Sequence, residues 1–237
     1  VYVVLGPVEG EISLESADAK ITSDEPESVT GIVTTMGDGD GDGIDDLVVT
    51  YYDPDEVYWL YVLSGPMSGD YDLSEADGVW ESETESAQAR SEAGDINGDG
   101  LGDFLTNFTD GWGSGNSGTY LMIGPATGDH SMSDAEATIS SRVLEWGDDA
   151  GRAGDMDGDG AGDVVIACDD YAFLFLGPIS GSLTTSDAEA WSDGSNSTVE
   201  AGGDTNGDGL DDILICSADG TGGLGALYVV EGPWTTS

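Results

Sequence analysis

The sequence has very little positive charge. Four Lys and Arg residues accompany 49 Asp and Glu residues, and the formal net charge at pH 7 is −45. A chain this acidic repels nucleic acids and anionic membranes and attracts cations, so we expect no nucleic-acid partner. A solubilising surface or adaptation to high salt would also explain the acidity. Much of it, however, recurs at fixed spacing, which neither explanation requires.

Cysteine, histidine and long apolar stretches are also scarce. Two cysteines, Cys168 and Cys216, set no disulfide framework. No apolar stretch approaches the ~18 residues of a membrane-spanning helix, so we expect no membrane insertion. No signal peptide is visible and the first residue is Val1 instead of Met, which we interpret as a processed or excised product. The 38% of hydrophobic residues is still enough for a folded core.

Repetition is what the sequence has in abundance, and it indicates a repeat protein. A short apolar run that ends in Gly-Pro is typical of a strand followed by a turn. Its copies are Val1–Pro7, Leu60–Pro66, Thr119–Pro125, Ala172–Pro178 and Leu227–Pro233. Small acidic patches follow the first four copies, at Ser16–Ala19, Ser74–Asp77, Ser133–Glu136 and Ser186–Glu189. We interpret residues 1–237 as one repeat domain with units of roughly 1–59, 60–118, 119–171 and 172–226, and a partial fifth copy at 227–237.

A second repeated block lies between these runs. It reads Asp-x-Asp/Asn-Gly-Asp-Gly-x-x-Asp, and each copy leads into a further apolar run. The four copies are 38–46, 95–103, 155–163 and 204–212. They recur roughly every 55 residues, which leaves room for about four short strands per unit, the size of a propeller blade.

The repeated block predicts a calcium loop. Its glycines let the backbone curl, so that alternate acidic side chains converge on one point. Calcium accepts six to eight hard oxygen ligands in flexible geometry, whereas magnesium prefers rigid octahedra with several waters and zinc prefers His or Cys. We therefore predict four Ca²⁺ ions per chain, each held by four side chains, one main-chain carbonyl and water. The predicted side-chain ligands are Asp38, Asp40, Asp42 and Asp46; Asp95, Asn97, Asp99 and Asp103; Asp155, Asp157, Asp159 and Asp163; and Asp204, Asn206, Asp208 and Asp212. The predicted carbonyl ligands are those of Ile44, Leu101, Ala161 and Leu210.

The block begins like an EF-hand loop but ends differently. An EF-hand carries a bidentate Glu at position twelve of its loop. That position holds the strand-forming residues Val49, Thr106, Ile166 and Ile215 in this chain. The other explanation is an acidic turn without a metal, and four copies in register argue against it.

The four loops, the apolar strands after them and the Tyr-Val-x-x-Gly-Pro strands together resemble the FG-GAP repeat family of integrin α-subunit heads and of many secreted bacterial proteins. The resemblance covers essentially the whole chain. It implies an all-β fold, a β-propeller in which each calcium loop joins the first two strands of a blade, and an extracellular or cell-surface location. Where the family has Gly-Ala-Pro, this chain has Thr50-Tyr-Tyr, Asn107-Phe-Thr and Cys168-Asp-Asp. The family usually closes seven blades, whereas four units are present here.

Little in the sequence favours catalysis. The single histidine, His130, is expected in a surface turn, and no Gly-x-Ser-x-Gly elbow is present. The segment Gly220–Gly225 matches a dinucleotide fingerprint by letter, but a strand follows it instead of a helix, so we interpret it as a turn. We therefore expect that the chain is not an enzyme.

Tryptophan recurs about once per unit, after the acidic patch, at Trp80, Trp146 and Trp191. These side chains either pack between blades, which we favour, or form platforms on which sugars stack.

These patterns lead to a functional hypothesis with two alternatives. We expect an extracellular calcium-binding structural or adhesive repeat protein, whose partners are other copies of itself or a surface protein or glycan. The alternatives are a carbohydrate-binding, lectin-like propeller and a non-catalytic module of a secreted hydrolase. The chain starts and stops at copies of the third strand, Val1–Leu5 and Leu227–Val230, which leaves one unit without its fourth strand. An open edge recruits partners, so we expect either ring closure within one chain or, with slight preference, head-to-tail assembly into a filament.

Overall fold

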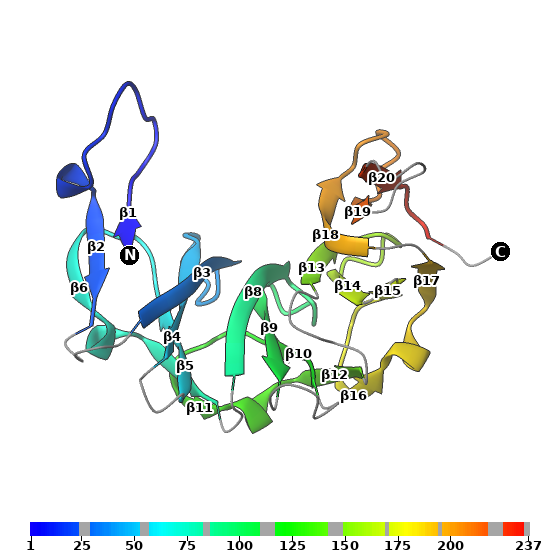
Figure 1. Cartoon of the computed structure of the whole chain (residues 1–237), viewed down its shortest axis with the longest axis horizontal. Helices are drawn as coiled ribbons and strands as arrows, with labels where there is room; N and C mark the ends of the chain where they lie inside the picture. Colours follow the sequence, from blue (N-terminus) through cyan, green and yellow to red (C-terminus); the bar gives the residue numbers. More distant parts are fainter. Residues whose placement is uncertain are drawn as a thin grey trace.

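The protein is described here by a computed structural model, which covers residues 1–23, 29–52, 57–82, 86–109, 117–141, 149–168, 171–193, 196–217 and 225–234. These residues form β-strands and short 3-10 turns, so the predicted all-β class is confirmed. The strands belong to five sheets, which follow one another along an open arc (Figure 1).

Strands in four successive positions recur along the chain, and we call them the first, second, third and fourth strands. Within a sheet, each pairs antiparallel with the next. The first strands are β3 (Val29–Gly37), β8 (Ser86–Gly94), β13 (Asp149–Gly154) and β18 (Asn196–Gly203). The second strands are β4 (Asp46–Tyr52), β9 (Asp103–Thr109), β14 (Asp163–Cys168) and β19 (Asp212–Ser217). The third strands, each leading to a Gly-Pro turn, are β1 (Tyr2–Val3), β5 (Tyr58–Leu63), β10 (Ser117–Met122), β15 (Tyr171–Phe175) and β20 (Ala226–Val230). The fourth strands are β2 (Ala19–Thr22), β7 (Gly78–Glu81), β12 (Ala137–Ser141) and β17 (Ala190–Asp193).

A further short strand follows three of the Gly-Pro turns, and the sequence did not predict it. These strands are β6 (Gly69–Asp72), β11 (Gly128–Ser131) and β16 (Gly181–Thr184). Each pairs in parallel with the fourth strand of the preceding sheet. The resulting sheet orders are β1-β2-β6, β3-β4-β5-β7-β11, β8-β9-β10-β12-β16, β13-β14-β15-β17 and β18-β19-β20. The boundaries between the sheets therefore do not coincide with the boundaries between the sequence units.

The predicted acidic patches overlap or adjoin 3-10 turns. These turns are η1 (Leu14–Ser16), η2 (Leu73–Glu75), η3 (Met132–Asp134) and η4 (Thr185–Asp187). In η2, η3 and η4 the first-turn acid and the residue before the turn bond each other's backbone, which is a capping box. Part of the acidity therefore has a local structural role that needs no metal.

The core lies between the faces of neighbouring sheets. Successive residues of a strand point to opposite faces, so one second strand serves two interfaces. On β14, Val164 packs toward the sheet of β9, while Val165 packs toward the sheet of β19. All six residues of β14 are buried, which explains why the run after each loop is apolar on both faces.

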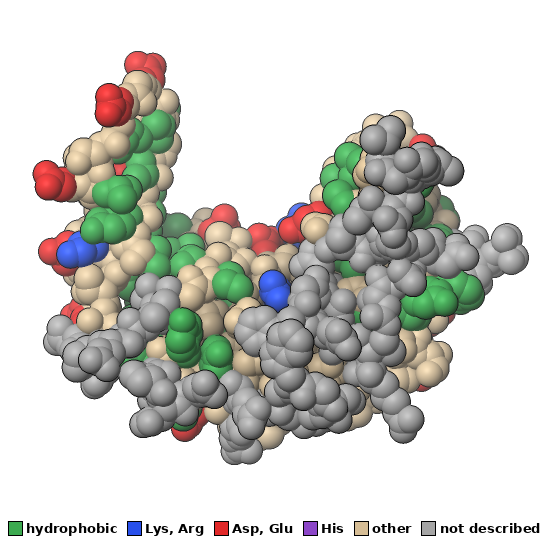
Figure 2. Space-filling model, viewed as in Figure 1, with side chains coloured by type: hydrophobic (Ala, Val, Ile, Leu, Met, Phe, Trp, Pro, Cys, Tyr) green, Lys and Arg blue, Asp and Glu red, His purple; other side chains and the backbone are tan. Residues whose placement is uncertain are grey.

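The arrangement of the sheets is an arc that strand pairing does not close. The first strands β3, β8, β13 and β18 lie next to one another along its concave side (Figure 1). Within the described part of the chain, no strand pairing joins the N-terminal sheet β1-β2-β6 to the C-terminal sheet β18-β19-β20. The space-filling view shows the two terminal sheets as separate arms (Figure 2).

The structure also answers three smaller sequence expectations. No disulfide joins Cys168 and Cys216, as expected. Trp80 is buried between two sheets, where its ring meets Phe104 edge-to-face at 6.3 Å between centroids. His130 lies on the strand β11 instead of in a turn, and its ring stacks on Trp80 at 4.4 Å. The expectation of a surface turn at His130 was therefore wrong, because this residue belongs to the unpredicted parallel strand.

Candidate metal sites

All four predicted loops join the first strand of a sheet to its second strand. Each first strand ends at a glycine that pairs in register with the last acidic residue of the loop. In the first loop, these residues are Gly37 and Asp46. The loop is thus a hairpin connection whose ends are fixed by the sheet. Gly41 and Gly43 within it have φ angles of 84° and 89°, which other residues rarely adopt, and this turns the chain tightly enough to gather the acids.

The side chain at the first position of each loop accepts hydrogen bonds from backbone N–H groups of the same loop. In loop one, Asp38 accepts hydrogen bonds from the backbone N–H groups of Gly41 (2.7 Å) and Gly43 (2.8 Å). The Asp at the fifth position accepts from the residue two further on, as Asp42 does from Ile44 at 2.8 Å. In loops two, three and four the first Asp likewise accepts from the glycine at position six, and the Asp at position five accepts from position seven, at Asp95 and Asp99, Asp155 and Asp159, and Asp204 and Asp208.

The structure brings the first three acids of loops one and three together. Carboxylate oxygens of Asp38, Asp40 and Asp42 lie within 4.8 Å of one another, and those of Asp155, Asp157 and Asp159 do the same. In loops two and four the middle acid is replaced by an amide. Asn97 donates to Asp99 (2.9 Å) and Asn206 donates to Asp208 (3.1 Å), so each amide stabilises the neighbouring carboxylate by a hydrogen bond.

The last acid of each loop has a different place from the first three. Asp46, Asp103, Asp163 and Asp212 are buried at the start of the second strands. Each accepts one backbone hydrogen bond from the second residue of its own loop and one from the glycine of the following Gly-Pro turn. For Asp103 these donors are Ile96 at 2.8 Å and Gly124 at 2.9 Å. The last acid therefore fastens the loop to the end of the third strand.

Burial makes the ionised form of three of these four acids less favourable. Burial raises the pKa of Asp103 and that of Asp163 to about 6, and it also raises the pKa of Asp46. Asp212 differs, because the Thr205 hydroxyl donates to it and lowers its pKa. The clustered carboxylates of loops one and three are all-oxygen donors, which fit a hard divalent ion such as Ca²⁺, whereas the buried fourth acid is not part of either cluster.

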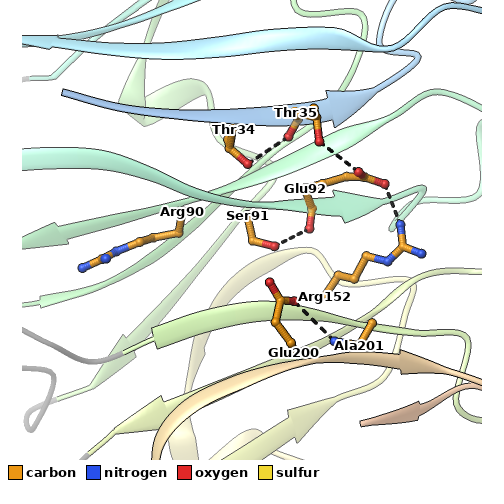
Figure 3. A pocket seen from close by; sticks show the side chains of 8 residues that line it. All are labelled: Thr34, Thr35, Arg90, Ser91, Glu92, Arg152, Glu200 and Ala201. Carbon is orange, nitrogen blue, oxygen red and sulfur yellow. Dashed lines mark hydrogen bonds and ion pairs between the residues drawn. The ribbon is translucent and has the colours of Figure 1, made fainter. Parts of the chain in front are cut away.

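A cavity of about 360 Å³ lies apart from the loops, along the first strands (Figure 3). Two arginines and two glutamates line it, so its charges balance. Arg152 binds Glu92 at 2.5 Å, and Thr35 donates to the other oxygen of Glu92 at 3.1 Å. These contacts join three neighbouring sheets, whereas Arg90 points away from the ion pair (Figure 3). The side chains that line the cavity therefore help to hold neighbouring sheets of the arc together.

The structure tests two other sequence observations only in part. Trp191 is 53% exposed, so the expected packing between blades is wrong for this residue. Trp146 and residues 220–224 lie outside the described residues.

Comparison with known protein families gives no match for this chain, and no curated protein matches it. The FG-GAP resemblance therefore rests on the loop and strand motifs alone. In the described part of the chain, no helix has the length and hydrophobicity that crossing a membrane requires.

Proposed function

We propose that this chain is an extracellular calcium-binding structural or adhesive module, built from FG-GAP-like β-propeller blades. The observation that carries the proposal is the repetition of one oxygen-rich loop at the same place in four sheets. The two carboxylate triads, Asp38–Asp40–Asp42 and Asp155–Asp157–Asp159, are the clearest donor sets. Without a cation, three carboxylates this close repel one another, and a bound ion removes that repulsion.

The packing of the sheets supports the propeller part of the proposal. Neighbouring sheets stack face to face, and their first strands lie next to one another on the concave side (Figure 1). This is the arrangement that blades around an axis require. Calcium in each loop would hold the connection between the first and second strands rigid, which a short, acidic, glycine-rich hairpin needs.

Calorimetric titration with calcium tests the proposal. We expect four sites per chain. The Asp42→Asn variant removes the negative charge of a predicted ligand of loop one, so it should weaken one site. Asp45→Asn is the matched control, because Asp45 is an exposed acid of the same loop that is not a predicted ligand. Fewer than three sites in the unmodified chain, or equal effects of the two variants, would contradict the assignment.

A carbohydrate-binding function is the second candidate, and one surface feature favours it. Exposed Trp191 lies 5.8 Å from the ring of Tyr171, which is also exposed. Exposed aromatic rings of this kind can stack on the apolar faces of sugars. A glycan array compares the unmodified chain with Trp191→Ala: binding that the variant loses supports this function, and absence of binding by the unmodified chain rejects it.

Self-association is the remaining part of the proposal. Leu227, Tyr228 and Val229 of β20 are between 49% and 60% exposed, and apolar residues of the N-terminal segment are exposed as well. The third strands β1 and β20 belong to two copies of the same sequence, Tyr-Val-Val-x-Gly-Pro. The fourth strand β2 pairs antiparallel with β1, as β7 does with β5. The β2 strand of a second copy is therefore a suitable antiparallel partner for β20. Light scattering in millimolar calcium should show assembly that grows with protein concentration. A strictly monomeric species at high concentration would reject this part alone.

A further inference from the structure

Backbone hydrogen bonds link successive loops across the sheet boundaries. The N–H of Gly102, in loop two, donates to the carbonyl of Asp38, in loop one, at 2.7 Å. The N–H of Gly162, in loop three, donates to the carbonyl of Asp95, in loop two, at the same distance. The N–H of Asp211, in loop four, donates to the carbonyl of Asp155, in loop three, at 3.0 Å. The four loops therefore form one continuous hydrogen-bonded series.

Each link joins equivalent positions. The acceptor is always the first residue of a loop, which is a predicted side-chain ligand. The donor is always the eighth residue of the next loop, between its predicted carbonyl ligand and its last predicted side-chain ligand. The peptide group Leu101–Gly102, for example, has a carbonyl assigned to the ion of loop two and an N–H bonded to loop one. One rigid peptide group thus belongs to two sites.

The link between loops three and four is double. Besides the backbone bond, the Asp211 carboxylate accepts a hydrogen bond from the N–H of Asp155 at 2.9 Å. This carboxylate lies against Gly154, where a Cβ atom would come within 2.2 Å of it. The link between loops one and two is equally close, because a Cβ atom on Gly102 would lie 2.0 Å from the Met36 carbonyl oxygen. These contacts leave little freedom for one loop to move without its neighbour.

We infer that calcium binding is positively cooperative between neighbouring loops, and that the peptide groups Leu101–Gly102, Ala161–Gly162 and Leu210–Asp211 transmit the coupling, together with the Asp211 carboxylate at the link between loops three and four. The inference rests on the proposed calcium function. An ion that fixes the first residue of one loop also fixes the eighth residue of the next, and with it the adjacent ligands. A carbonyl that coordinates an ion makes the N–H of its own peptide group a stronger donor, because hydrogen bonds in series polarise one another. Coupling of this kind is reciprocal, so each loop strengthens binding at the other.

Electrostatics acts in the opposite direction. A filled loop is less negative, so it attracts the next ion less than an empty loop does. At physiological ionic strength the Debye length is about 8 Å, which screens this effect between exposed loops, whereas the hydrogen-bonded link is unaffected. The cooperativity should therefore be seen most clearly at about 0.15 M salt.

Nuclear magnetic resonance resolves the loops individually. The amide signal of the glycine at position six reports calcium occupancy for each loop, with Gly160 reporting loop three. Loop four is disabled by Asp204→Ala together with Asp208→Ala, and calcium is titrated. We expect the Kd of the unaltered loop three to rise at least about fivefold, the lower end of typical coupling between sites.

The Asp211→Gly variant tests the route of the coupling. It keeps the backbone N–H of position eight but removes the carboxylate that holds Asp155. In this background, disabling loop four should change the Kd of loop three less than in the unmodified chain. Asp45→Gly is the matched control: Asp45 occupies position eight of loop one, is exposed, and this variant should leave the coupling between loops three and four unchanged.

The outcomes separate the inference from the proposed function. If no loop binds calcium, the proposed function fails. If the loops bind calcium but the Kd of loop three does not change when loop four is disabled, the inference alone is overturned. Should the loop-four variant unfold, its amide spectrum reveals this. The comparison then uses the unmodified chain and Asp211→Gly: the calcium concentrations at which loops three and four fill should lie closer together in the unmodified chain than in the variant.

Discussion

Replacement of Trp80 by alanine should destabilise the protein strongly, because this side chain fills the space between two sheets. Trp80 is 3% exposed and contacts Phe104 of the next sheet and His130 of the parallel strand β11. Burying a tryptophan removes ~150–250 Å² from water, which at ~25 cal/mol per Å² corresponds to about 4–6 kcal/mol. Trp→Ala substitutions in cores cost ~3–5 kcal/mol. For a chain of this length, each kcal/mol lowers Tm by roughly 2–4 °C, so the expected decrease is roughly 6–20 °C.

Trp191→Ala is the matched control for this prediction. Trp191 also lies on a fourth strand, but it is 53% exposed, so less than half of the same area term applies and the loss should be about 2–3 kcal/mol at most. A third variant, Trp80→Phe, keeps an aromatic ring next to His130 and removes an indole N–H that is buried without a hydrogen-bond partner in the described structure. It should therefore cost less than Trp80→Ala.

Thermal unfolding of the three variants, followed by circular dichroism at one saturating calcium concentration, measures these differences. The reasoning fails if Trp80→Ala costs no more than about 0.5 kcal/mol, the range of ordinary surface substitutions. It also fails if Trp80→Ala and Trp191→Ala have equal effects, because burial between sheets would then not determine the cost.

Four further predictions concern the loops and the thiols. Excess chelator should lower Tm by many degrees, since each site filled at one hundred times its Kd contributes about 2.7 kcal/mol; an unchanged melting curve would contradict this. Loops one and three, with four Asp side chains each, should bind calcium more tightly than loops two and four, which a site-resolved titration checks. Asp103→Ala should cost about 2–6 kcal/mol in denaturant unfolding, even with chelator present, because it leaves two buried N–H groups without acceptors, each worth ~1–3 kcal/mol. A non-reduced digest analysed by mass spectrometry should contain no peptide linking Cys168 to Cys216, since no disulfide joins them in the structure.

The strands around the loops were predictable because their residue composition matches the burial of each strand face. The run after each loop is apolar on both faces, as β14 shows, and a strand between two packed sheets needs that composition. The loop residues were predictable for a similar reason: glycine spacing and acid spacing together permit one tight turn. The all-β class follows from these two signals.

The parallel strands could not be found in the same way. Gly69–Asp72 and Gly128–Ser131 are short and polar, and each pairs only with a strand of the preceding sheet. Their strand conformation is set by that distant partner, which a local pattern does not contain. The same reason explains the error at His130. The place of the last loop acid was also not predictable, because its bond to the Gly-Pro turn joins residues about twenty positions apart, as in Asp103 and Gly124.

The parallel strands have a practical consequence for dividing this protein into fragments. A recombinant boundary would naturally be placed in a connection between a fourth strand and the next first strand. Cutting between β2 and β3, between β7 and β8, or between β12 and β13 removes the outermost strand from the sheet just before the cut. The N-terminal fragment then exposes the edge of β2, β7 or β12, and exposed edges promote aggregation. Fragments that include the residues through the following parallel strand should be more soluble than those that end at the repeat boundary.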